Sequence, residues 1–214
     1  ATSTSYKYNM QLVPTKYYEN CVRTEVIEEL KNLYYNAENY QTDIMMKTSG
    51  KTPQVLELLE TITQIDMDRI DTSHFYLHNM PYLPHTDFRN NVKENVVIPI
   101  EVINGPNPSL VIFDQWWPEP SNTWVFDWPH KFEINKELKG RPCDYDIENK
   151  TDCDIDEELY TEHLNHFPKE NWRGLSGKAY KLQPGNLVEF DAKMIHATGT
   201  MQCEKKLGLT IRYK

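Results

Sequence analysis

Three residues of this chain have the types and spacing of a metal site. His85 and Asp87 stand two positions apart in Pro84-His85-Thr86-Asp87, so both side chains can reach one ion. A third ligand must come from elsewhere, and His196 is the natural candidate, because it follows a strand-like run that begins with a Pro-Gly turn. Two imidazoles and one carboxylate on one face of an ion leave its opposite face open, the usual ligand set of non-haem Fe(II) oxygenases. The tripeptide alone is also compatible with a turn that has a capping Asp and a surface His.

The first part of the chain has two helical patterns. Apolar residues recur at helical spacing from Val22 to about Tyr35. Thr52 and Pro53 form a good helix start, with Thr52 as the cap and Pro53 at the first position. The second helix is expected to carry one apolar stripe, made of Val55, Leu58, Leu59, Ile62 and Ile65.

Strand patterns follow after Asp71. Six runs rich in β-branched and aromatic residues are expected to be strands: 74–78, 95–104, 109–114, 180–182, 186–191 and 207–213. Helices first and short strands afterwards predict a mainly β (α+β) fold, an antiparallel sandwich or barrel with a helical layer on one face. A jelly roll of eight core strands fits the 214 residues.

We expect one domain over residues 1–214, with a helical layer at about 15–70 and core strands at about 71–114 and 178–214. The insert between them, about 115–177, contains all five tryptophans and an acidic run. Long inserts between core strands often form lids, so we expect this one to cover the active-site mouth. Its histidines, His130, His163 and His166, are expected to be surface residues.

Composition narrows the partners. The sequence has 23 basic and 32 acidic residues and a formal charge of −9, which argues against a nucleic-acid partner. Residues 1–7 lack the apolar core of a signal peptide, and no run is long and apolar enough to span a membrane. We therefore expect a cytoplasmic protein with no membrane partner. Cys143 and Cys153 could pair, but two reduced thiols suit that compartment better.

The ordered motifs resemble the Fe(II)- and 2-oxoglutarate-dependent dioxygenase superfamily. The resemblance rests on His85-Thr86-Asp87, the β-rich run 96–104, Gln183–Asp191 leading to His196, and the closing run 207–213. It covers roughly residues 70–113 and 180–214, and it does not include the insert. It implies a double-stranded β-helix (jelly-roll) core, with Fe(II) held by His85, Asp87 and His196. It also implies 2-oxoglutarate as cosubstrate, O₂ as oxidant, and hydroxylation of a small-molecule or peptidyl substrate with release of succinate and CO₂.

The resemblance further implies a basic residue on the last strand that binds the distal carboxylate of 2-oxoglutarate. Arg212 and Lys206 both qualify, sixteen and ten positions after His196, and they share one face of a strand. We favour Arg212, because its planar fork binds a carboxylate bidentately and strand residues flank it on both sides. Lys206 follows Lys205 near a probable turn, where a solvated lysine is expected.

Two other functions stay open. One is a cupin-like metal enzyme with a jelly-roll fold that does not use 2-oxoglutarate, and the other is a non-enzymatic jelly-roll binding module. Arg212 argues against the first, and the second leaves the metal triad unexplained. His74, Tyr76 and His78 share a strand face and could line a pocket, but packing or surface roles are the expectation for each. The prime substrate and the oligomeric state are not determined by the sequence.

Overall fold

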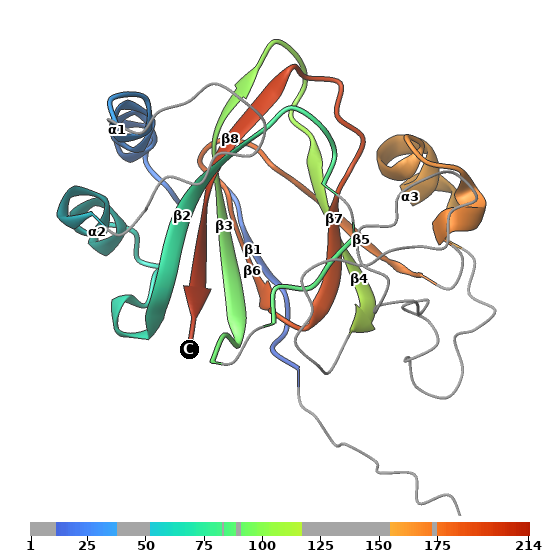
Figure 1. The fold of residues 1–214 in the computed structure, drawn as a ribbon, viewed down its shortest axis with the longest axis horizontal. Coiled ribbons are helices and arrows are strands. Elements are labelled where there is room, and N and C mark those ends of the chain that lie inside the picture. The colour runs from blue at the N-terminus through green and yellow to red at the C-terminus, as the bar shows by residue number, and fades with distance from the viewer. Residues whose placement is uncertain (1–11, 38–51, 83, 89–90, 117–154, 173–174) are drawn as a thin grey trace, which may run out of the picture.

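Two antiparallel sheets face each other and form the body of the protein (Figure 1). The computed structural model describes residues 12–37, 52–82, 84–88, 91–116, 155–172 and 175–214. The larger sheet has the strand order β1-β6-β3-β8-β2, and the smaller has the order β5-β4-β7. Their bounds are β1 Lys16–Tyr18, β2 Ile70–His78, β3 Glu94–Ile103, β4 Ser109–Trp116, β5 Gly177–Lys181, β6 Leu187–Asp191, β7 Met194–Thr198 and β8 Lys205–Tyr213.

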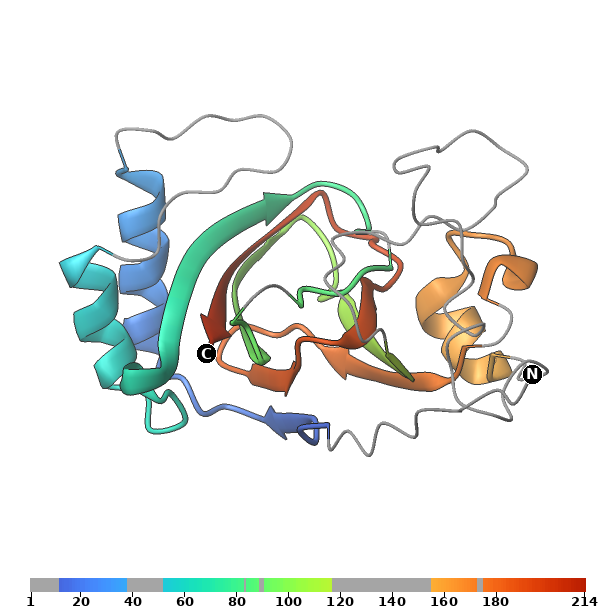
Figure 2. The same cartoon turned by 60° about the horizontal axis from the view of Figure 1, so that its bottom comes forward.

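Two helices, α1 (Thr24–Tyr35) and α2 (Pro53–Glu60), lie on the outer side of the larger sheet (Figure 2). The Thr52 hydroxyl accepts a hydrogen bond from the Val55 amide at 3.4 Å, so the predicted cap is confirmed. The predicted stripe is too long, because the helix ends at Glu60 and the buried Ile62 lies beyond it. Short helical segments complete the set: η1 Met67–Arg69, α3 Glu157–Leu159, η4 Tyr160–Leu164 and η5 Lys169–Trp172.

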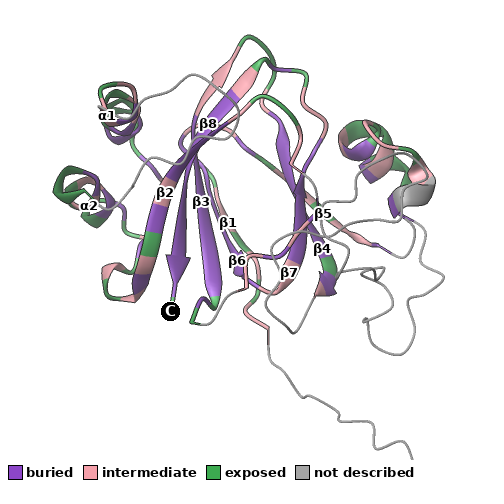
Figure 3. Ribbon diagram, in the orientation of Figure 1, coloured by how far each residue is buried: buried purple, intermediate pink, exposed green. Residues whose placement is uncertain are grey.

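The outer face of the larger sheet packs against these two helices. Phe75 of β2 contacts Tyr34 of α1, with ring centroids 5.5 Å apart. Because side chains alternate along a strand, burying Phe75 and Leu77 outward turns His74, Tyr76 and His78 inward. Figure 3 shows the larger sheet as mostly buried and the two helices as exposed only on their outward sides. The fold thus leaves the inner sheet face to line a cavity.

The predicted fold class is confirmed: mainly β, with a jelly-roll core and N-terminal helices on one face. All six predicted strands are present, although β2, β4, β5 and β8 are longer than expected. The prediction missed β1 and did not see that His196 lies inside a strand, β7. No helix among the described residues is long and apolar enough to cross a membrane.

The described end of the insert packs on the outer side of the smaller sheet. Trp172 is fully buried, stacks on Phe113 and donates its indole N–H to the carbonyl oxygen of Leu164. His163 and His166 are half-buried rather than fully exposed, so the expected surface positions hold only in part. Each has a hydroxyl partner, Ser109 at 3.1 Å and Thr200 at 2.9 Å respectively, and burial lowers the pKa of His166 to about 4. Residues 117–154, with His130, Cys143, Cys153 and the expected lid, lie outside the described residues.

Candidate metal centre

Backbone pairing brings the three predicted ligands together. The amide of His85 donates to the carbonyl oxygen of His196 at 3.0 Å, and the amide of His196 donates back at 2.9 Å. The amide of Asp87 donates to the carbonyl oxygen of Ala192 at 3.0 Å. The segment that carries His85 and Asp87 is therefore fixed along β7 and the turn that precedes it. One ligand atom from each of His85, Asp87 and His196 lies within 4.8 Å of the others, which is close enough to hold one ion.

Neighbouring groups set the protonation states of His196 and Asp87, and both states suit metal binding. Nδ1 of His196 lies 3.1 Å from the carbonyl oxygen of Met194 and donates its proton there, which leaves Nε2 free to bind a metal. That Nε2 is 3.5 Å from Oδ2 of Asp87. Burial acts to raise the pKa of the Asp87 carboxyl, but the hydrogen bond with His196 and the nearby His85, His196 and Arg212 hold this pKa well below its usual range. Asp87 is thus a carboxylate at neutral pH.

Arg212 contacts Asp87, one of the three candidate ligands, directly. Its Nη2 donates to Oδ1 of Asp87 at 2.9 Å, and both side chains are largely shielded from solvent, 11% and 15% exposed. The guanidinium is therefore engaged with a candidate metal ligand.

Lys206 lies at the other end of the cavity. Its Nζ donates to the Thr198 hydroxyl at 2.8 Å and lies 5.5 Å from the centre of the Tyr76 ring. The residue is only 4% exposed, so the expected solvated lysine was wrong. No acidic side chain pairs with it among the described residues, and desolvation by burial lowers its pKa to about 7. A buried amine without an acidic partner favours the binding of an anion, because pairing offsets the cost of burying the charge.

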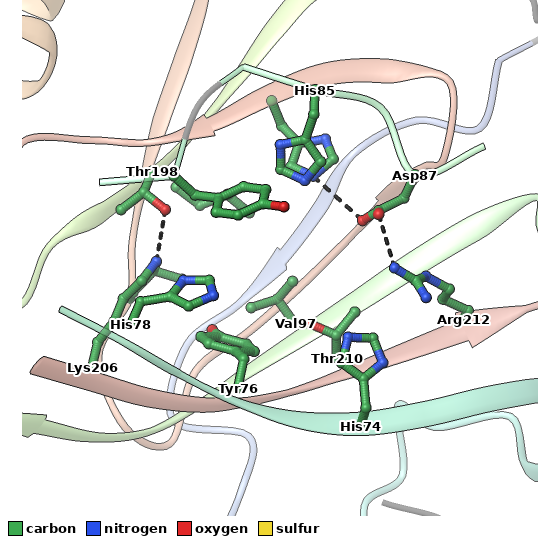
Figure 4. A pocket seen from close by; sticks show the side chains of 14 residues that line it. His74, Tyr76, His78, His85, Asp87, Val97, Thr198, Lys206, Thr210 and Arg212 are labelled. Carbon is green, nitrogen blue, oxygen red and sulfur yellow. Dashed lines mark hydrogen bonds and ion pairs between the residues drawn. The ribbon is translucent and has the colours of Figure 1, made fainter. Parts of the chain in front are cut away.

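One cavity joins the two ends (Figure 4). Asp87 and Arg212 lie at one side, and Lys206 and Thr198 lie at the other. The lining also includes His74, Tyr76 and His78, so the expectation that these residues only pack or face solvent was wrong. The remaining lining residues are Tyr82, His85, Val97, Leu110, Leu182, His196 and Thr210.

Sequence reasoning missed several of these lining residues, among them Tyr82 and Thr198. Tyr82 stacks on His78 with ring centroids 5.3 Å apart and meets the His85 ring edge-on at 4.5 Å. Thr198 holds the buried lysine. A signal existed for Thr198, because it stands two positions after His196 and therefore on the same strand face.

Comparison by sequence finds no matching family model and no matching curated protein. Comparison by structure finds SnoK, a non-heme alpha ketoglutarate dependent carbocyclase from nogalamycin biosynthesis, at a TM-score of 0.52 and 10% identity over 93% of this chain and 78% of SnoK. SnoN, an alpha ketoglutarate dependent epimerase from the same biosynthesis, matches at 0.51 and 11% identity over 93% of this chain and 77% of SnoN. HygX from Streptomyces hygroscopicus, solved with nickel and 2-oxoglutarate bound, matches at 0.50 and 7% identity over 93% and 81%.

The chain has the fold of the non-haem, 2-oxoglutarate-dependent enzymes. These neighbours include an epimerase and a carbocyclase, so the shared fold supports more than one reaction outcome. The fold therefore does not choose the outcome for this chain, and function has to be argued from the site.

Proposed function

We propose that this protein is a non-haem Fe(II) oxygenase that uses 2-oxoglutarate and O₂ to hydroxylate a small-molecule or peptidyl substrate, with release of succinate and CO₂. One observation carries the proposal: the triad of His85, Asp87 and His196 shares a cavity with a buried lysine that has no acidic partner among the described residues. The triad fits a metal, and the lysine fits a carboxylate.

The donor set suits Fe(II). Two imidazole nitrogens and one carboxylate oxygen are the 2-His-1-carboxylate set of non-haem iron oxygenases. In this role His85, Asp87 and His196 hold the ion, and the low pKa of Asp87 keeps the carboxylate available as a ligand without a proton to displace. The cavity side of the ion stays open for other ligands.

Lys206 is the better candidate for the distal carboxylate of 2-oxoglutarate, which reverses the preference drawn from the sequence. Arg212 already donates to Asp87, whereas the Thr198 hydroxyl is the one hydrogen-bonding partner of Lys206 within the part of the chain that the structure describes. A carboxylate beside Lys206 would stabilise the ammonium form of the lysine, which burial disfavours. The Tyr76 hydroxyl, on a ring close to Lys206, can donate a second hydrogen bond to that carboxylate. Lysine then binds the anion as a point charge and Thr198 orients its ammonium.

In this proposal the protein's own residues position the metal and the cosubstrate and exclude water from the cavity. When bound, Fe(II) and 2-oxoglutarate supply the oxidising chemistry with O₂. The backbone pairs of His85 and His196 fix the ligand geometry, and Lys206 with Thr198 fixes the far end of the cosubstrate. The apolar walls, Val97, Leu110 and Leu182, keep water away from the reacting centre.

The test is an anaerobic titration of the protein with Fe(II) and 2-oxoglutarate, followed by visible absorption. The proposal expects the metal-to-ligand charge-transfer band of a chelated 2-oxo acid, and its loss in a His196→Ala variant that remains folded by circular dichroism. If the parent binds Fe(II) without the band, a metal enzyme that does not use 2-oxoglutarate replaces this proposal. If it binds no metal at all, a non-enzymatic binding module does.

A further inference from the structure

The two oxygens of Asp87 have different partners. Oδ2 lies 3.5 Å from Nε2 of His196, the ring nitrogen that is left free to bind a metal. Oδ1 accepts the hydrogen bond from Nη2 of Arg212 at 2.9 Å. One oxygen therefore faces the metal position and the other is engaged by a cation. With both side chains shielded from solvent, this ion pair is weakly screened.

That asymmetry matters because a carboxylate can bind a metal through one oxygen or through two. An octahedral ion has six positions, and two histidines with a one-oxygen carboxylate leave three of them open. A chelating 2-oxo acid takes two positions and a gas molecule takes the third. If Asp87 bound through both oxygens, only two positions would remain, and the chelator alone would fill them.

We propose that Arg212 is a positioning residue that withdraws Oδ1 of Asp87 from the metal, so that Asp87 binds through Oδ2 alone and one more coordination position stays open. This inference rests on the metal site of the proposed function, but it does not depend on 2-oxoglutarate being the cosubstrate.

A second residue, Asn95 of β3, supports the position of Arg212. Asn95 and Arg212 are directly opposite each other in the β3–β8 register, so their side chains lie on the same face of the sheet. Asn95 is fully buried, and neither its amide oxygen nor its amide nitrogen has a hydrogen-bond partner among the residues that the structure describes. Within the same residues, Nε of Arg212 is also buried without a partner.

Buried polar atoms left unpaired are costly, so neighbouring unpaired groups point to a bridge between them. The carbonyl oxygen of Asn95 can accept from Nε of Arg212, directly or through one buried water. The guanidinium would then be held at Nε by Asn95 and would hold Asp87 through Nη2. The chain from Asn95 through Arg212 to Asp87 gives the guanidinium one fixed orientation, which a flexible surface arginine lacks.

The direct test is a pair of crystal structures of Mn(II)-loaded protein, the parent and Arg212→Met. We expect one Asp87 oxygen within bonding distance of Mn(II) in the parent and two in the variant. Arg212→Lys, which keeps a cation and a donor, should restore one-oxygen binding. One-oxygen binding in Arg212→Met, or Oδ1 as the bound atom in the parent, would overturn the inference.

A solution test uses nitric oxide as a probe of the open position on Fe(II), read by the S = 3/2 electron paramagnetic resonance signal. Without 2-oxoglutarate, parent and Arg212→Met should both give the signal. With saturating 2-oxoglutarate the parent should keep the signal. In the variant the signal intensity should fall by at least about tenfold, since all the coordination positions of Fe(II) would then be filled. The comparison is made where the charge-transfer band shows that 2-oxoglutarate is bound to both proteins, and equal signals under that condition would contradict the inference.

Two further variants keep the test decisive. Arg69→Met removes a cation from a different ion pair, the one with Glu94, and should leave the signal unchanged. If Arg212→Met does not fold, Asn95→Ala serves instead, and a mixture of one- and two-oxygen binding is expected.

If the parent binds no Mn(II), the metal site and this inference both fail. If it binds Mn(II) through Asp87 but the Fe(II)-loaded protein gives no charge-transfer band with 2-oxoglutarate, only the proposed function fails.

Discussion

Lys206 and Arg212 leave the same face of β8, yet their charged groups end at opposite sides of the cavity, on Thr198 and on Asp87 (Figure 4). They stand six positions apart, which places their Cα atoms about 20 Å apart along the strand. A metal held by Asp87 would lie at the Arg212 side, so a five-carbon diacid that chelates it would extend toward Lys206. The separate tasks that we propose for the two cations can therefore be told apart by variants.

The first prediction concerns cosubstrate affinity. Lys206→Ala should raise the Kd for 2-oxoglutarate by about 10- to 100-fold, because a hydrogen bond to a charged group contributes about 1.5–3 kcal/mol. Arg212→Lys should raise it by less than about threefold, since Arg212 contacts Asp87 instead. The measurement is an anaerobic titration of the charge-transfer band. Equal losses in the two variants would show that Lys206 has no special role as the anchor.

The second prediction concerns pH. Burial lowers the pKa of Lys206 to about 7, so in the free protein the amine loses its proton as pH rises through 7. Binding a dianion requires the charged form, and above pH 7 it must therefore take up a proton. The Kd for 2-oxoglutarate should rise by up to about tenfold per pH unit between roughly pH 7.5 and 9. Calorimetry in buffers of different ionisation enthalpy should detect this proton uptake in the parent and not in Lys206→Met.

The third prediction concerns stability without ligands. The buried Lys206 amine, with its lowered pKa, reduces the free energy of unfolding. The reason is that above pH 7 the unfolded chain binds a proton that the folded protein does not hold. Lys206→Met fills similar space without a charge, and should raise the free energy of unfolding by about 1–3 kcal/mol at pH 7.5. Urea unfolding of metal-free protein measures the change. A less stable Lys206→Met protein would mean that the Thr198 bond outweighs the desolvation of the amine.

Most of the fold could be predicted because its core strands are long and locally distinctive. The β-branched run of β3 and the closing run of β8 are strand-like in any context, and Thr52 with Pro53 fixes the start of α2 through local chemistry. By contrast, β1 is a strand only because three residues, Lys16–Tyr18, pair with β6. Such a short element has no period of its own, and tertiary pairing decides it.

The site was only partly predictable, for a related reason. His85 and Asp87 are close in sequence, and the Pro-Gly turn marks the strand before His196. The state of Lys206 depends on contacts with Thr198 and Tyr76 that lie on other strands. Its local sequence, two lysines after a glutamate, is typical of a solvated turn. Likewise, both faces of β2 carry bulky residues, so alternation alone could not say which face lines the cavity.

The last prediction concerns Gly208, which lies opposite Tyr76 in the pairing of β2 with β8. A Cβ added at Gly208 would overlap the ring and hydroxyl of Tyr76. In the middle of a strand, alanine is ordinarily preferred to glycine by about 0.5–1 kcal/mol. Here we expect the opposite sign, because the ring must move into the cavity: Gly208→Ala should destabilise the protein by about 1–3 kcal/mol and weaken 2-oxoglutarate binding.

A double-mutant cycle isolates this contact. In a Tyr76→Val background the ring is gone, so Gly208→Ala should be neutral or slightly stabilising there, and the coupling free energy between the two positions should exceed about 1 kcal/mol. Urea unfolding of the four proteins gives that coupling. If Gly208→Ala costs the same with and without the ring, backbone strain in β8 accounts for the effect. Glycine at 208 would then have no part in shaping the wall beside Lys206.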